Sequence, residues 1–155
     1  RHPMPTIEEL LITKPIKDPY NRALLSIMYT GSWLVSRITK LLKPYDISEP
    51  QYNVLRILRG QHGKPINMFA VQSRMLQRMS NVSRLVDKLV EKGLVQRTQT
   101  KETRRMVDLT ITEKGLALLT ELDPVIGDYM HNIARNLKKD EARTLSEWLD
   151  ILRNE

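Results

Sequence analysis

The feature that most constrains the fold is the stretch from residue 80 to residue 111, where a helical pattern runs directly into two β-rich runs. Within residues 82–90 the apolar side chains recur at i, i+3, i+4, i+7 and i+8, which buries one face of a helix and leaves the other polar. Gly93 then predicts a left-handed helix end. The runs LVQRTQT and RRMVDLTI alternate in character around a polar tip, which predicts a β-hairpin.

Helical patterns fill most of the remaining chain. Apolar spacing and capping residues predict five further helices: Asp18 to about Pro44, Ser48 to just before Gly60, Ile66 to Leu76, Thr112 onward, and about 139–153. The dipeptide Asp123-Pro124 predicts a kink or break in the fourth of these. Three helices followed by a two-stranded ribbon form a winged helix-turn-helix. We therefore expect a mainly α protein with a small β-ribbon wing, as a single domain over 1–155 with its winged part at about 48–111.

Composition and the absence of certain motifs exclude several classes of function. A chain of 155 residues with 41% apolar content buries the core of one domain, and the absence of cysteine excludes disulfides and thiol catalysis. No run of about eighteen apolar residues and no secretory-type stretch is present, so we expect a cytoplasmic protein. No glycine-rich phosphate loop, metal motif or nucleophile elbow occurs, so we expect neither an enzyme nor a cofactor.

The positive charge is concentrated in the middle of the chain. The net charge is +7, and residues 72–105 hold nine Lys/Arg against three Asp/Glu, whereas residues 116–155 hold five against eight. A local excess of cations on a helix and ribbon predicts contact with a polyanion such as double-stranded DNA. A solvated basic face is the alternative interpretation.

Small polar and cationic side chains on the exposed face of residues 80–88 fit base and phosphate recognition. Asn pairs with adenine, Arg with guanine, and Ser with a base or a phosphate. Arginines at a wing fit a narrow minor groove or the phosphate backbone. The predicted DNA-binding residues are Arg74, Gln77, Ser80, Asn81, Ser83, Arg84, Lys88, Lys101, Arg104 and Arg105.

The stretch NVSRLVDKLVEKGLVQRTQTKETRRMVDLTITEKG resembles the multiple-antibiotic-resistance-regulator (MarR) family of bacterial transcription factors. The family pattern joins a TVTRLVDRLEKKGLV-like helix to an arginine-tipped wing and LTEKG. Weaker similarity includes ISEPQYNVLRIL and the long terminal helices, so the resemblance covers about residues 19–153. One position departs from the family pattern: an aspartate usually stands two positions before the wing arginine, where this chain has Thr103. Glu102 is the alternative carboxylate.

The resemblance implies a homodimer whose N- and C-terminal helices, about 18–44 and 113–153, interlock. Two winged domains would then bind a pseudo-palindromic operator with half-sites about 10 base pairs apart, and the protein would act as a repressor. The predicted dimer-interface residues are Leu24, Met28, Leu34, Trp148, Leu149 and Leu152, with ordinary packing within one chain as the alternative. The resemblance also implies a small aromatic or lipophilic effector, in a crevice lined by Trp33, Arg37, Tyr52 and Tyr129.

Several residues have competing interpretations. Met68, Met75 and Met79 are expected in the core rather than in a redox or ligand site. A metal site at His62, Asp128 and His131 has too few converging ligands to be favoured. We expect Asp87 and Glu91 to form ion pairs within their own helix, beside Arg84 and Lys88. A winged-helix module that binds a protein partner, or binds DNA without sequence preference, is the alternative function.

Overall fold

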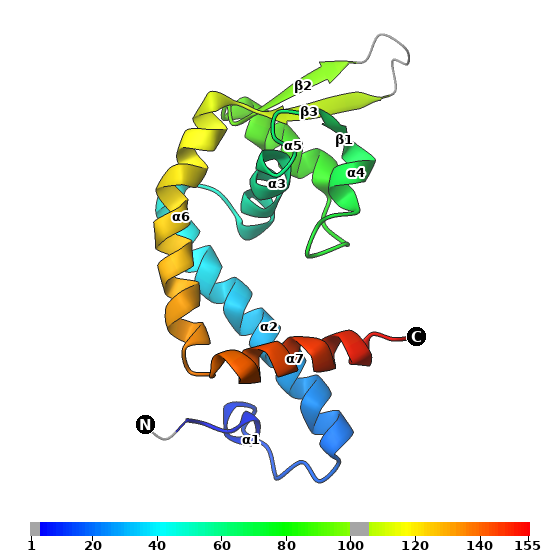
Figure 1. The fold of residues 1–155 in the computed structure, drawn as a ribbon, viewed down its shortest axis with the longest axis vertical. Helices are drawn as coiled ribbons and strands as arrows, with labels where there is room; N and C mark the ends of the chain where they lie inside the picture. Colours follow the sequence, from blue (N-terminus) through cyan, green and yellow to red (C-terminus); the bar gives the residue numbers. More distant parts are fainter. Residues whose placement is uncertain (1–3, 100–105) are drawn as a thin grey trace. The chain divides into compact units, whose positions relative to one another are not determined.

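The structure is a computed structural model that describes residues 4–99 and 106–155. It confirms a mainly α fold with a small antiparallel sheet (Figure 1). The chain divides into two compact units, Arg1–Glu49 and Pro50–Glu155. None of the helices in the described residues is both long enough and apolar enough to cross a membrane.

The first unit contains the short helix α1 (Ile7–Leu10), the long helix α2 (Pro19–Leu42) and the 3-10 turn η1 (Lys43–Tyr45). Helix α2 begins as predicted, because the Asp18 carboxylate accepts a hydrogen bond from the Tyr20 backbone N–H and Pro19 occupies the first turn. Helix α1 was not predicted. A capping box stabilises it, in which the Thr6 hydroxyl accepts from the Glu9 N–H and the Glu9 carboxylate accepts from the Thr6 N–H.

The second unit begins with the winged domain. Its helices and strands are α3 (Glu49–Arg59), β1 (Ile66–Asn67), α4 (Met68–Gln72), α5 (Val82–Glu91), β2 (Val95–Gln99) and β3 (Val107–Ile111). The strands pair antiparallel in the order β1-β3-β2, with Val95 opposite Ile111 and Ile66 opposite Leu109. Helices α3, α4 and α5 lie together beside this sheet (Figure 1). Fully buried side chains from all three helices and from β3 form the core: Val54, Leu55, Val71, Val86, Leu89 and Leu109.

The predicted third helix, from Ile66 to Leu76, is wrong at both ends. Residues Ile66–Asn67 form strand β1 because they pair with the middle strand β3, and the Asn67 side chain then caps α4 by accepting from the Ala70 N–H at 2.8 Å. The helix stops at Gln72, and residues 73–81 form a turn. A long-range strand pairing, which the local apolar spacing does not encode, replaces the first turn of the expected helix.

The three methionines predicted to lie in the core differ in how far they are buried. Met75 is buried, as expected, and Met68 is partly buried. Met79 is 98% exposed, so its assignment to the core is wrong. Met79 lies in the loop between α4 and α5, where no helical periodicity determines which side chains are buried.

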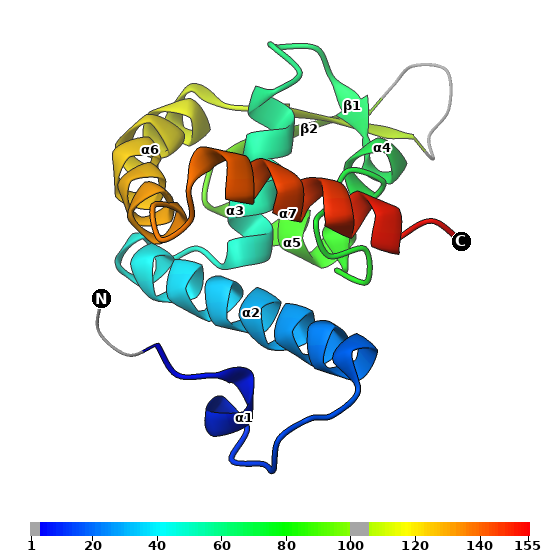
Figure 2. The same cartoon turned by 60° about the horizontal axis from the view of Figure 1, so that its bottom comes forward.

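Helix α6 (Glu113–Ala134) begins at the predicted cap, where the Thr112 hydroxyl accepts from the Gly115 N–H. It continues through Pro124, so the helix does not break there, and a kink at this proline stays a prediction. Proline removes one backbone donor, and the buried side chains Leu119, Leu122 and Ile126 on either side hold the helix together. Helix α7 (Lys139–Leu152) follows close to the predicted bounds and runs in a different direction from α6 (Figure 2).

Candidate nucleic-acid interface

Helix α5 has the two-sided character that the sequence predicted. Val82, Val86 and Leu89 are buried. On the opposite side Ser83, Arg84 and Lys88 are exposed. Asn81 caps the helix, and its side-chain oxygen accepts from the Arg84 backbone N–H at 3.2 Å. A polar, cationic helix face is therefore presented to solvent, which is what contact with base edges requires.

The capping role changes what Asn81 can offer to a base. Recognition of adenine by asparagine uses the side-chain oxygen and the NH₂ group together. Here the oxygen already accepts a hydrogen bond, although a carbonyl oxygen has a second lone pair and the NH₂ donors are not used by the cap. Asn81 therefore combines a structural function with any function in recognition.

Arg74 and Gln77 are exposed, and Ser80 is partly buried. The sequence placed the first two near the end of a helix, and this is a correction, because both lie in the turn 73–81. The Arg74 guanidinium donates to the Ala70 carbonyl at 2.8 Å, which satisfies one of the free carbonyls at the end of α4. Arg78, in the same turn, is also exposed and was not predicted, although it adjoins Gln77 in the sequence.

The ribbon forms as predicted, with β2 paired to β3. The wing residues Lys101, Arg104 and Arg105 lie outside the described residues. Within the described part, the Arg97 guanidinium on β2 lies 2.5 Å from the Asp87 carboxylate on α5. The ion pair predicted for Asp87 within its own helix is therefore wrong. Its partner, Arg97, comes from the middle of β2, so the pair ties the ribbon to α5.

The residues predicted for an effector crevice fall in both units. On α2 the Arg37 guanidinium lies 5.8 Å from the centre of the Trp33 ring. Both line a cavity of about 300 Å³ together with Tyr29, Ser32, Ser36 and Lys40. The cavity wall thus combines two aromatic rings with two cations.

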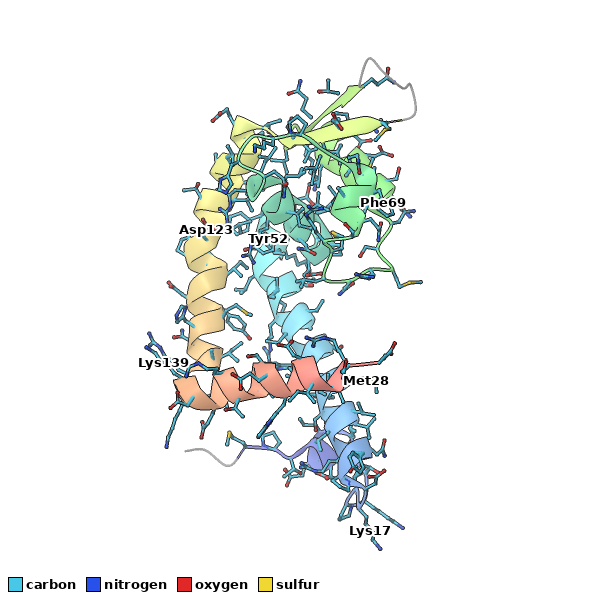
Figure 3. All side chains as sticks on the ribbon, turned by 45° about the vertical axis from the view of Figure 1, so that its right-hand side comes forward. Lys17, Met28, Tyr52, Phe69, Asp123 and Lys139 are labelled. Atoms are coloured by element: carbon cyan, nitrogen blue, oxygen red, sulfur yellow. The ribbon has the colours of Figure 1, made fainter. Side chains whose placement is uncertain are left out.

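Tyr52 and Tyr129 belong to the second unit. Tyr52 on α3 is buried, the Arg56 guanidinium lies 5.8 Å from its ring centre, and burial raises the pKa of its phenol. Tyr129 on α6 is partly buried. The next turn of α3 carries Arg59, which forms two hydrogen bonds of 2.9 and 3.0 Å to Asp123 on α6. Figure 3 shows Tyr52 and Asp123 on these two helices.

Most of the predicted dimer-interface residues expose apolar surface. Leu24, Met28, Trp148 and Leu152 are exposed, and Leu34 and Leu149 are partly buried. Helix α7 has no buried residue at all, and its exposed apolar side chains are Leu145, Trp148, Ile151 and Leu152. An amphipathic helix without a buried face has apolar surface that another chain can cover.

Known proteins share this arrangement. The model of the MarR family matches residues 45–106, from η1 to the beginning of β3. The transcriptional repressor MprA of Escherichia coli is 28% identical over 131 residues, which are 83% of this chain and 74% of that protein.

The chain is therefore similar to proteins of the MarR family.

Solved structures of MarR proteins are also similar to this chain. A MarR transcription factor from Planctomyces limnophilus is 26% identical with a TM-score of 0.68, and the match covers 88% of this chain and 99% of that one. A mutant MarR of Escherichia coli complexed with operator DNA is 25% identical with a TM-score of 0.71, covering 87% and 94%.

Proposed function

We propose that this protein belongs to the MarR family and is a sequence-specific DNA-binding transcriptional regulator that represses a promoter as a homodimer on a pseudo-palindromic operator. One observation carries the proposal: α5 presents Ser83, Arg84 and Lys88 to solvent beside an antiparallel ribbon. The segment 72–105 has nine Lys/Arg against three Asp/Glu, a net +6, which suits a phosphate backbone. The repressor MprA and the operator complex of Escherichia coli MarR support the same function by similarity.

We assign separate functions to the groups that would touch DNA. Ser83, Arg84 and the free donors of Asn81 would contact base edges, and Lys88 would contact the backbone. Arg74, Gln77 and Ser80 would hold phosphates beside the helix. Lys101, Arg104 and Arg105 would extend the contact to the minor groove from the wing.

The homodimer is supported by exposed apolar surface. Trp148 is 65% exposed and Met28 is 64% exposed, and each lies on a long helix outside the winged domain. We propose that a second copy of the chain covers these residues together with Leu24, Leu34, Leu149 and Leu152. Residues 1–155 would then act as one functional module, in the cytoplasm, where the chromosome is.

A small aromatic or lipophilic effector would modulate the binding. The cavity on α2 pairs the Trp33 ring with the Arg37 guanidinium, a combination that suits an aromatic ligand carrying an anionic group. Tyr52 and Tyr129, in the second unit, remain effector contacts predicted from the sequence. Its binding would change the spacing of the two reading helices, because a rigid dimer fits successive major grooves only within a narrow range.

Arg84→Ala tests the function directly. Fluorescence anisotropy on a preferred duplex should show a loss of about 1–3 kcal/mol, together with relaxed preference at one base pair, because a guanine contact is removed. Arg143→Ala is the matched control, since Arg143 is an exposed arginine of the acidic C-terminal segment. Equal weakening on every sequence would show a phosphate contact only, and unchanged binding by Arg84→Ala would contradict the assignment.

A further inference from the structure

Exposed apolar side chains in the winged domain precede and follow α5 in the sequence. We call α5 the reading helix, after the function proposed for it. Within the described residues of the winged domain, 50–99 and 106–111, the large exposed apolar side chains are Phe69, Leu76, Met79 and Met106. Figure 3 shows Phe69 on the outer side of α4. Single exposed apolar residues are common on protein surfaces. Two features distinguish Met79 from such residues: its position before α5 and the hydrogen bonds that hold the backbone on either side of it.

The turn 73–81 that carries Met79 is held at several points. The Gln72 side-chain amide donates to the carbonyl of Arg78, and the Ser80 N–H donates to the carbonyl of Gln77 at 3.2 Å. Farther back, the Asn53 side chain on α3 accepts from the Leu76 N–H at 2.9 Å. Met79 therefore lies between Arg78 and Ser80, whose backbone groups are both hydrogen-bonded, and these bonds hold the backbone from which its exposed side chain extends.

Met79 is also close to the beginning of the reading helix. It stands two residues before the cap Asn81, so its Cα lies at most about 7 Å from that of the cap. Arg78 precedes it directly, and Arg74 lies in the same turn, and both are exposed. An apolar side chain that follows one exposed arginine directly and shares its loop with another fits a surface that is apolar in one place and anionic around it.

The major groove of DNA at a thymine is such a surface, apolar at one point and anionic around it. The C5-methyl group of thymine is an apolar point in the groove, and phosphates line both of its edges. Methionine is unbranched and polarisable, so it adapts to such a target. An apolar groove on a protein partner would not account for the two exposed arginines in the same loop as Met79.

We propose that Met79 contacts a thymine methyl group in each half-site while Arg78 contacts an adjacent phosphate, so that the turn 73–81 is a second reading element. The inference rests on the proposed function. It adds a source of sequence preference from a residue outside the helix.

The test uses an operator obtained by selection and replaces each thymine in turn by uracil, which removes only the methyl group. At one position per half-site, wild-type affinity should fall about fourfold, the effect of one buried methyl group. The Met79→Ala variant should bind the thymine and uracil duplexes equally. Arg78→Ala should lower the salt dependence of binding by about one phosphate contact.

Ile12→Ala is the control, because Ile12 is 94% exposed and lies in the other unit, outside the winged domain. It should discriminate thymine from uracil as the wild type does, and circular dichroism should show that all variants are folded. If Met79→Ala still discriminates at that position, the proposal is wrong although the DNA-binding function stands. If selection yields no preferred sequence, both proposals are wrong.

Discussion

Gly115 lies where the first turn of α6 passes close to the end of the ribbon. A Cβ atom at this position would lie 2.4 Å from the Leu94 carbonyl oxygen and 2.6 Å from Cγ1 of Ile111. Both distances are too short for real contacts, and one of the two atoms belongs to the backbone, which cannot rotate away. The contact explains why a helix begins with glycine in its third position despite the poor helix propensity of that residue.

Gly115→Ala should therefore destabilise the protein by about 1–3 kcal/mol, the usual cost of forcing atoms into a packed site. Urea unfolding followed by circular dichroism measures the change. Gly127→Ala in the same helix is the control, because nothing lies within 4 Å of its Cβ position, and it should leave stability unchanged or raise it by up to about 1 kcal/mol. Equal effects of the two substitutions would contradict the packing argument.

Glu8 shows how one ion pair fixes a segment at the start of the chain. Its carboxylate accepts from the Arg22 guanidinium at 2.6 and 3.2 Å, and this hydrogen bond lowers the pKa of Glu8 from 4.5 to about 2. Because the folded pKa is the lower one, the stabilising contribution is complete above about 4.5. It is lost as the pH falls from there through about 2.

Carboxyl NMR titration should therefore give a Glu8 pKa near 2 in the wild-type protein. In Arg22→Ala it should return toward 4.5, because the donor of the hydrogen bond is gone. Arg143→Ala is the control, because Arg143 pairs with Asp140 in the other unit, and it should leave the Glu8 pKa near 2. A Glu8 pKa that is the same with and without Arg22 would contradict the ion pair.

Individual residues were predictable from the sequence where a periodic pattern determines them. The buried face of α5, with Val82 and Val86, follows from spacing alone. The Asp87–Arg97 pair does not, because it joins residues of two different elements whose approach depends on the ribbon. Met79 was misplaced because it lies in the loop between α4 and α5, where the backbone path, and not a periodic pattern, decides which apolar side chains are buried.

At the scale of elements, Arg59 and Asp123 connect α3 of the winged domain to α6. Arg59 lies in the last turn of α3 and bonds through two nitrogens to both oxygens of Asp123 on α6. The hydrogen bond that Arg59 donates to Asp123 raises the pKa of the Arg59 guanidinium. Two-point geometry makes this contact more specific than a single ion pair, although both side chains are partly exposed to solvent.

A double-mutant cycle of Arg59→Ala and Asp123→Ala should give a coupling free energy of about 0.5–1 kcal/mol in urea unfolding, decreasing with salt. Arg59→Lys should recover only part of it, since an ammonium group cannot bond both oxygens in the same plane. The exposed pair of Arg143 and Asp140 on α7 serves for comparison and should couple more weakly. A coupling of zero for the first pair would mean that α3 and α6 are held by apolar packing alone.

Element boundaries were predictable where a cap or a glycine defines them. Asp18, Thr112 and Gly93 each mark a boundary that the structure confirms. Strand β1 could not be predicted, because two residues, Ile66 and Asn67, carry no strand pattern and depend on a partner more than forty positions away, as the register of Ile66 with Leu109 shows. Pro124 does not break α6, because tertiary burial outweighs the loss of one hydrogen bond.

At the scale of the whole molecule, the proposed homodimer would form through apolar surface that one chain leaves exposed, such as that of Trp148. Trp148→Glu should therefore weaken self-association by about 2 kcal/mol or more, as truncation of a central interface tryptophan usually does. Sedimentation velocity measures the change. Ser146→Glu, at an exposed polar position of the same helix, should remain dimeric. A wild-type protein that sediments as a monomer would contradict the dimer proposal.

The distribution of charge over the whole chain was the most useful sequence observation on function. Composition alone gives only a net charge of +7, whereas its concentration in residues 72–105 indicates the helix and ribbon that the structure places together. The effector could not be predicted from the sequence. Trp33 and Tyr52 lie in different units, and aromatic residues at helical spacing are also typical of a packed core.

The central claim is that the surface around α5 reads a DNA sequence. The most direct measurement is the binding of purified protein to a pool of random duplexes, with the enriched sequences determined and the affinity followed against salt concentration. The account predicts an enriched inverted repeat with half-sites about 10 base pairs apart and a steep salt dependence. Salt-dependent binding without an enriched motif, or no binding at low salt, would contradict it.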